Sequence, residues 1–214
     1  MTETIMTRDE TIASTSASTS ANTSDSKTAR KAMIDSQLRT SGVNEEFVLG
    51  RMMAVPREDF LPATKQALAY IDRSIAIPAG ALASPLFYGK MLIEAAPVRD
   101  DRVLIVEGGT GYLATLVAPL VSSVKTVSAD AAATGKVEGS YSLVLIDGAI
   151  EQLPDELRDC IEEGGRIVSG LLLRQVTRLA TGRKIVGQVT LQPVEDQGIP
   201  VLHSFDAPKK WTFS

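Results

Sequence analysis

A glycine-rich turn carries the clearest chemical signal in this sequence. The apolar run 103–107 predicts a buried strand, and an apolar stretch of helical character follows shortly after it. Between the two lie Gly109, Thr110 and Gly111. Glycines let the backbone turn tightly and let a ligand approach without interference from a Cβ atom, and a helix that begins here directs free N–H groups toward a polar group. The turn predicts a cofactor loop, with a turn that only packs a helix on a strand as the plainer alternative.

A nicotinamide-dinucleotide site is another interpretation of the same turn. Gly109, Gly111 and Ala114 match the spacing G-x-G-x-x-G/A of dinucleotide-binding enzymes. Those enzymes also need an acidic residue about 20 positions further on, which binds the ribose hydroxyls. Asp130 stands near that distance, two residues beyond Ser128, where the next predicted strand ends. This alternative stays open.

Asp147 is a second candidate for ligand binding. It closes the apolar run YSLVLID over residues 141–147. Ligands of open α/β sheets bind beyond the carboxyl ends of the strands, so an acid at this position points to a ligand. The alternative role for Asp147 is to cap the following helix or to form a turn.

These residues have to be positioned by an alternation of strands and helices in the second half of the chain. We expect strands over 103–107, 123–128, 141–147 and 166–171, and helices over 111–121 and 153–163. Pro119 should end or kink the first of these helices. Continuous apolar strands are typical of a parallel sheet covered on both faces, and the rest of the chain suits a terminal antiparallel pair. The predicted fold class is α/β, with a mostly parallel, Rossmann-like sheet.

The chain divides into three parts by composition. Half of residues 1–28 are Ser or Thr, so this segment has little apolar surface to offset the entropy of ordering it, and it predicts a disordered tail. Residues 29–98 predict a helical N-terminal extension, and residues 99–214 predict the Rossmann-like domain.

Caps and prolines mark the helices of the extension. Gly42 is expected to end one helix, and Asn44 to cap the next, which should bury Phe47 and Met52. Pro85 fits the first turn of a third helix.

Composition excludes several classes of function. The net charge of −4 offers no basic surplus for binding nucleic acid, and no apolar run approaches the ~18 residues of a membrane span. The N-terminus has no apolar segment of a secretory signal, so we expect a cytoplasmic protein. The single residues Cys160 and His203 exclude an internal disulfide, a cysteine-based zinc site and a His-rich metal centre.

The chain resembles a known family over about residues 33–192. The N-terminal block MIDSQLRTSGVNEEFVLGRMMAVPREDFLP, followed by LAYID, resembles protein-L-isoaspartate O-methyltransferases. The residues in register with that family are Gln37, Leu38, Arg39, Gly42, Val43, Val48, Leu49, Val55, Pro56, Arg57, Glu58, Phe60, Pro62, Ala69, Tyr70 and Asp72. The glycine turn then resembles the S-adenosylmethionine loop of the family, and residues 141–168 resemble its later strand, helix and GGR segment.

The resemblance implies methyl transfer from S-adenosylmethionine to isoaspartyl carboxylates in damaged proteins. Such proteins or peptides would be the partners. The carboxylate is already a nucleophile and the sulfonium an activated electrophile, so catalysis is mostly in-line positioning and desolvation. We expect the cofactor to be bound by Glu107, Gly109, Thr110, Gly111, Ser128 and Asp147, without a metal.

The acids of the cofactor loop depart from the family pattern. Family members carry an acid two positions before the first loop glycine; Ile105 holds that position here, and Glu107 stands at the glycine itself. The displaced carboxylate could reach the ammonium group of the cofactor, or the side chain could fill the pocket. At the end of the next strand, Ser128 replaces the acid that accepts the ribose hydroxyls, which puts ~1–3 kcal/mol of affinity in question.

A strand of the family fold should also be missing. The family fits a helix, an edge strand and an adenine-contacting loop between the strands that end at Ser128 and begin at Tyr141. Only residues 129–140 are available here, and a crossover alone takes ~10–12 residues. We therefore expect 123–128 to form the edge of the sheet.

The substrate side carries a further departure. The family has an active-site serine two positions before a proline, in an I-S-x-P turn; in LASP, the residue two before Pro85 is Ala83, and Ser84 follows one position late. We expect Ser84 to contact the substrate carboxylate. The competing hypothesis is a catalytically silent descendant that keeps the fold as a binding or regulatory module.

Overall fold

A computed structural model describes residues 25–135 and 137–207, and the predicted tail over residues 1–24 lies outside the described residues. Residues 25–28, which the sequence assigned to that tail, are helical and belong to a first helix over 25–33. The boundary drawn at residue 28 was therefore wrong by a few positions. No helix in the described ranges is long and apolar enough to cross a membrane.

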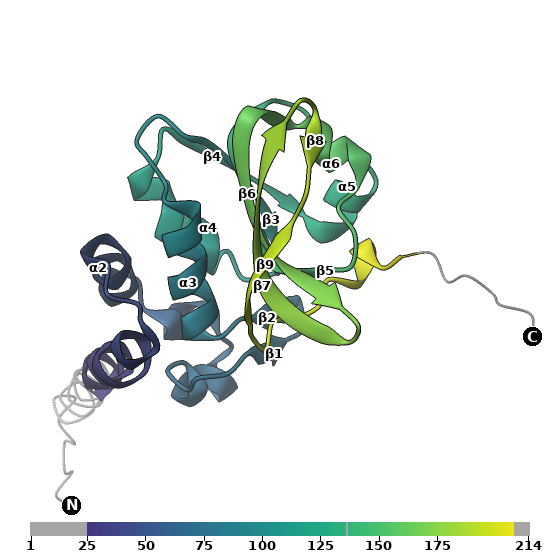
Figure 1. The fold of residues 1–214 in the computed structure, drawn as a ribbon. Coiled ribbons are helices and arrows are strands. Elements are labelled where there is room, and N and C mark those ends of the chain that lie inside the picture. The colour runs from purple at the N-terminus through teal and green to yellow at the C-terminus, as the bar shows by residue number, and fades with distance from the viewer. Residues whose placement is uncertain (1–24, 136, 208–214) are drawn as a thin grey trace, which may run out of the picture.

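A seven-stranded sheet organises the domain (Figure 1). Its strands are β3 (Arg102–Glu107), β4 (Ser123–Ser128), β5 (Tyr141–Ile150), β6 (Ile161–Leu173), β7 (Val176–Ile185), β8 (Gln188–Val189) and β9 (Gln192–Asp196). The spatial order is β4-β3-β5-β6-β7-β8, with β9 also paired to β7. β4, β3, β5 and β6 run parallel, while β7 is antiparallel to β6, β8 and β9. The predicted parallel sheet with an antiparallel end is confirmed.

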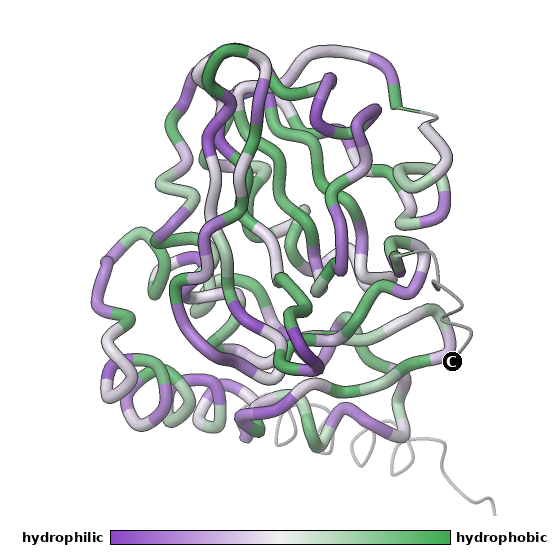
Figure 2. The backbone as a smooth tube through the Cα atoms, turned by 45° about the vertical axis from the view of Figure 1, so that its right-hand side comes forward, coloured by the Kyte–Doolittle hydropathy of each residue, from purple (hydrophilic) through white to green (hydrophobic). Residues whose placement is uncertain are grey.

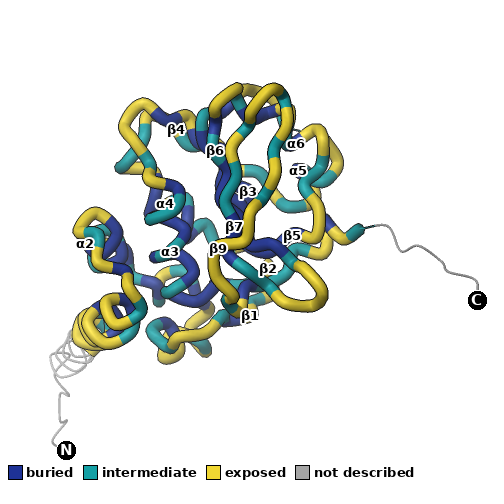
Figure 3. Tube along the Cα trace, viewed as in Figure 1, coloured by how far each residue is buried: buried dark blue, intermediate teal, exposed yellow. Residues whose placement is uncertain are grey.

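Helices cover both faces of this sheet. α2 (Glu46–Ala54), α3 (Pro85–Ala95) and α4 (Tyr112–Val117) belong to one hydrophobic core, and α5 (Ala129–Ala133) and α6 (Asp155–Asp159) to a second. Alternate residues of β3 divide between these cores: Val103 and Ile105 belong to the first, and Leu104 and Val106 to the second. Hydrophobic segments gather in the central strands (Figure 2), and buried residues line the faces where helices and sheet meet (Figure 3).

A small hairpin stands apart from the main sheet. β1 (Ile75–Ile77) and β2 (Gly80–Leu82) pair antiparallel. The hairpin leads into Ser84 and α3, which begins with Pro85 as predicted. It therefore carries the candidate substrate turn.

Several element boundaries differ from the predictions. The helix expected over 153–163 is only α6, because β6 already begins at Ile161. Gly164, at φ +78°, and Gly165 could have ended a helix, but they lie within β6 at a register shift. In the extension, the residue before α2 is Glu45 rather than Asn44, and Phe47 is 39% exposed, while Met52 is buried.

Pro119 and the missing strand behave as predicted. α4 ends at Val117, and a single 3-10 turn, Ala118–Leu120, contains the proline. Between β4 and β5 the described residues contain α5 and no strand, so β4 forms the edge of the sheet.

Candidate functional site

The glycine turn lies where β3 meets α4, as the sequence predicted. Gly109 and Gly111 adopt φ values of +102° and +72°, which favour glycine. The side chain of Glu107 folds back over the turn, and its Oε2 accepts the N–H of Gly111 at 2.9 Å. Thr110 Oγ1 accepts the N–H of Tyr112 at 3.3 Å. The carboxylate of Glu107 therefore already binds one N–H group of the loop, that of Gly111.

Asp147 lies against the same loop. A Cβ atom added at Gly108 would come within 3.1 Å of Asp147 Oδ2, so the loop rests against this carboxylate. Asp147 is 2% exposed, and β5 continues past it to Ile150 with a register shift, so it neither ends the strand nor caps a helix. Burial, and secondarily the charge of Glu107, raise the pKa of Asp147 to about 7. Burial also raises the pKa of Glu107.

Three candidate side chains come from the ends of adjacent strands. Glu107 pairs with Ser128 of β4 in the parallel register, and it directly follows Val106, which pairs with Ile146 of β5. The order across the sheet is therefore Ser128, Glu107, Asp147. Ser128 also caps α5, since its Oγ accepts the N–H of Ala131 at 3.2 Å.

A buried arginine, which was not predicted as a site residue, acts by its charge on Asp147. Arg57 is fully buried and donates to the carbonyl oxygens of Ala69 at 2.8 Å and Ala83 at 2.7 Å. Its guanidinium carbon lies 5.0 Å from the ring centre of Tyr112 and 5.6 Å from that of Tyr88. Its match to the VPRE block was the signal that could have identified it.

The tip of the β1–β2 hairpin lies directly on the glycine loop. Ala81 N–H donates to the carbonyl of Gly108 at 3.0 Å. A Cβ at Gly109 would lie 2.0 Å from Ala79 O, and a Cβ at Gly80 would lie 2.1 Å from Gly108 O. Only glycine fits at these two positions, and the hairpin covers the loop in this conformation.

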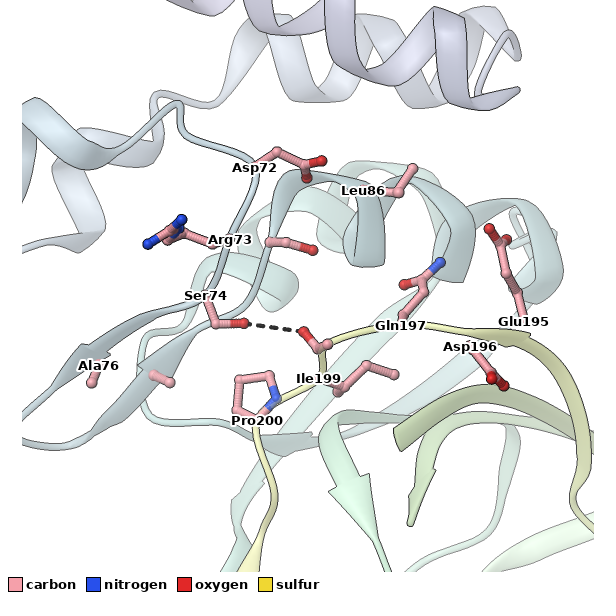
Figure 4. A pocket seen from close by; sticks show the side chains of 13 residues that line it. Asp72, Arg73, Ser74, Ala76, Leu86, Glu195, Asp196, Gln197, Ile199 and Pro200 are labelled. Atoms are coloured by element: carbon pink, nitrogen blue, oxygen red, sulfur yellow. Dashed lines mark hydrogen bonds between the residues drawn. The ribbon is translucent and has the colours of Figure 1, made fainter. Parts of the chain in front are cut away.

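Ser84 follows the hairpin and directly precedes α3. It caps α3, and its Oγ accepts the N–H of Phe87 at 3.2 Å. Ser84 lines an open groove of about 600 Å³. The groove runs between two chain segments, residues 72–74 and 195–200, and Ser74 Oγ donates to Gly198 O at 3.4 Å across it (Figure 4). Ala83, at the family serine position, is fully buried, and Ser84 is 9% exposed.

The C-terminal segment approaches the same end of the sheet from the second core. Ala149 N–H donates to Pro200 O at 2.7 Å, and Leu202 N–H donates to Ala149 O at 2.8 Å. Ser204 Oγ then donates to the carboxylate of Asp130 on α5. Asp130, the acid at dinucleotide spacing, is thus engaged within the protein. Among the described residues, no group of three or more His, Cys, Asp or Glu side chains could hold a metal ion.

Comparisons with known sequences agree on one family. Residues 28–134 match the family model described as protein-L-isoaspartate(D-aspartate) O-methyltransferase. A protein-L-isoaspartate O-methyltransferase of Koribacter versatilis is 31% identical over 193 residues, which cover 78% of this chain and 87% of the relative. Another, from Methanoculleus marisnigri, is 29% identical over 191 residues, which cover 77% and 87%.

Solved structures share the fold. A protein-L-isoaspartate O-methyltransferase superposes with a TM-score of 0.66 at 16% identity, and the match covers 81% of this chain and 65% of that one, just under two thirds of its length. A Plasmodium falciparum structure described as a protein-L-isoaspartate O-methyltransferase in complex with S-adenosyl-L-homocysteine gives 0.64 at 16% identity, covering 83% and 97%. At these identities, the likeness shows the fold.

Proposed function

Because this chain belongs to the protein-L-isoaspartate O-methyltransferase family, we propose that it transfers a methyl group from S-adenosylmethionine to isoaspartyl carboxylates in damaged proteins. The observation that best supports the proposal is that Ala81 contacts both the glycine loop and the groove. Its N–H bonds the glycine loop at Gly108, and the same residue lines the groove that also contains Ser84. A cofactor at the loop and a peptide in the groove would therefore meet at this hairpin.

The residues beside the loop fit the cationic end of the cofactor. One oxygen of Glu107 and both oxygens of Asp147 are buried without a hydrogen-bond partner in the described part of the chain. Buried carboxylate oxygens are costly unless a proton or a positive group satisfies them. S-adenosylmethionine supplies an ammonium group and, on its sulfonium, the activated methyl group. We assign the loop backbone, Gly109 to Gly111, to the same end of the cofactor, and Ser128 to its ribose.

We assign the substrate carboxylate to Ser84. The N–H of Phe87 fixes the Ser84 oxygen and leaves the hydroxyl hydrogen able to donate. The eleven-residue helix α3 begins directly after Ser84, so its N-terminal N–H groups and dipole also favour a carboxylate there. The carboxylate is already nucleophilic, so these residues only have to hold it in line and exclude water.

The groove suits a peptide segment as the partner. Its walls combine backbone with apolar side chains such as Leu86 and Ile199, and with the acids Asp72 and Glu195 (Figure 4). Such a lining accepts varied side chains, as repair of many damaged proteins requires. We propose that it holds the residues that flank the isoaspartate.

Methyl transfer to a matched peptide pair tests the proposal. One peptide carries isoaspartate and the other aspartate at the same position, with isotope-labelled S-adenosylmethionine as donor. We expect methyl ester only on the isoaspartyl peptide, and a loss of about 10- to 100-fold in kcat/KM in Ser84→Ala if one hydrogen bond to the substrate is lost in the transition state. Cofactor binding without any methyl ester would contradict the proposal.

The contact between hairpin and loop favours a second candidate, a catalytically silent binding or regulatory module. In that case the Glu107 side chain and residues 79–80 fill the cofactor site permanently. Equilibrium dialysis with S-adenosylhomocysteine separates the two candidates. The silent module predicts no binding to the wild type and a gain in Glu107→Gly, whereas the methyltransferase predicts wild-type binding that weakens in this variant.

A further inference from the structure

We propose that Glu107 and Asp147 share one proton in the cofactor-free protein and release it when the ammonium group of S-adenosylmethionine binds beside them. This inference rests on the proposed function, because it describes how the same site accepts the charge of the cofactor. Glu107 departs from the family pattern, in which the strand acid corresponds to Ile105 and a glycine corresponds to Glu107.

The sheet register brings the two carboxylates together. Val106 of β3 pairs with Ile146 of β5, and Glu107 and Asp147 are the next residues along these two parallel strands. Gly108, the residue after Glu107, packs directly on the carboxyl group of Asp147, since a Cβ there would lie 3.1 Å from Asp147 Oδ2. The two acids are therefore neighbours at adjacent strand ends, and the charge of Glu107 acts on Asp147.

Burial then prevents both acids from being ionised without a counter-charge. Asp147 is 2% exposed, and neither of its oxygens makes a well-formed hydrogen bond in the described structure. The Tyr88 phenol and the Gly108 N–H lie near the carboxyl group and lower its pKa, but burial outweighs them. Glu107 uses Oε2 to accept the Gly111 N–H, and its Oε1 is buried without a partner. Two neighbouring carboxylates in a dry site retain a proton between them. The raised pKa of Asp147, about 7, agrees with this geometry.

The surrounding groups set the local charge. Glu107 of β3, Tyr88 of α3 and Arg57 face Asp147. Burial raises the pKa of Tyr88 well above its usual value, so the phenol stays neutral. Arg57 is a permanent cation, and with one shared proton the pair carries one negative charge to balance it. An arriving ammonium group adds one positive charge, and loss of the shared proton restores the balance.

Proton release measured by calorimetry tests the inference. Titrating the full chain with S-adenosylmethionine in buffers of different ionisation enthalpy gives the number of protons released per cofactor bound. We expect release of about one proton at pH 6, and affinity by equilibrium dialysis should increase about tenfold for each unit that the pH rises toward 7. At pH 8.5 the acids are already ionised and the α-amino group of the cofactor, whose usual pKa is about 7.7–8.0, must gain a proton to bind as ammonium, so release should be replaced by uptake. The infrared C=O stretch of a protonated carboxyl group should be present before the titration at pH 6 and lost after it.

Two variants define the source of the proton. Below pH 7, Asp147→Asn should bind S-adenosylmethionine with an affinity that does not change with pH. It should release no proton and lack the infrared band. Asp155→Asn, which removes an exposed acid of α6, should behave as the wild type. Binding without proton release, or release that persists in Asp147→Asn, overturns the inference and leaves the proposed function standing. Absence of cofactor binding at every pH overturns both.

Discussion

Asp147 is an acid whose folded environment opposes its charge. Its carboxyl group is buried beside Glu107 without a hydrogen-bond partner in the described structure, and burial raises its pKa from 3.8 to about 7. The buried charge of Arg57 is stabilised instead, since two backbone carbonyls accept hydrogen bonds from its guanidinium. The two residues therefore predict different responses to pH and to substitution.

The stability of the protein should fall as pH rises through the folded pKa of Asp147. The raised pKa means that the native state binds more protons than the unfolded state between about pH 4 and pH 7, so stability is highest below this window and lost across it. Asp147→Asn removes this dependence. Urea unfolding should show the variant gaining on the wild type by roughly 2–3 kcal/mol between pH 5 and pH 8. A constant difference would show that Asp147 does not titrate in this way.

Arg57→Lys should be strongly destabilising. A lysine cannot reach both Ala69 O and Ala83 O, and a buried carbonyl left without its donor costs about 1–3 kcal/mol. We expect a loss of about 2–4 kcal/mol in urea unfolding. Arg51 is the matched control, because it also donates to two carbonyls, those of Leu116 and Thr115, from a partly exposed position. Arg51→Lys should cost below about 1 kcal/mol, since water replaces the lost donors, and equal losses in both variants would refute the role of burial.

At the scale of elements, the sequence predicted those whose signals are local. The apolar runs of β3 and β5, the glycine turn, Pro85 at the start of α3 and the early end of α4 before Pro119 all follow from residue type and spacing. The interval between β4 and β5 is too short for the additional strand that the family resemblance implies, and this predicted its absence. The end of the predicted helix 153–163 failed because Gly164 and Gly165 fit a strand irregularity as well as a helix end.

The site depended on contacts that residue spacing does not contain. Glu107, Gly109 and Asp147 could be placed together, because parallel strands bring their carboxyl ends to one edge. The packing of Ala79 and Gly80 on the loop could not be predicted, because it depends on the angle of a hairpin from another part of the chain. The groove beside Ser84 was missed for the same reason, since residues 72–74 and 195–200 form it from opposite ends of the fold.

The hairpin contact predicts a local effect of Gly80→Ala. The new methyl group would collide with Gly108 O, and φ at Gly80 is +143°, so the hairpin tip should separate from the loop. Hydrogen exchange at the Ala81 amide, which donates to Gly108 O, should become faster. Gly187→Ala is the control, because φ there is +73° and nothing lies within 4 Å. Unchanged protection of Ala81 in Gly80→Ala would show that the contact does not hold the hairpin in place.

At the scale of the whole molecule, the shortened sheet creates an open edge. β4 pairs only with β3, so the other side of this strand is unpaired in the described structure. Unpaired edges can join a strand of another molecule, and charged side chains, lysine above all, guard against this. Lys125 occupies the middle of β4, is exposed, and its Nζ donates to Glu138 O at 3.1 Å. Lys125, which an additional strand would cover, thus protects the open edge of β4.

Lys125→Val should therefore promote self-association. The substitution raises the strand propensity of β4 and removes its charge, while the buried core and the candidate site are untouched. We expect light scattering coupled to size-exclusion chromatography to show dimers or larger species that increase with protein concentration. Lys31→Val removes an exposed lysine from the first helix instead and should stay at the wild-type mass. Because edge pairing needs an open strand, adding a proline at Thr126 of the Lys125→Val variant should restore the wild-type behaviour, and association that persists there would place the contact elsewhere on the surface.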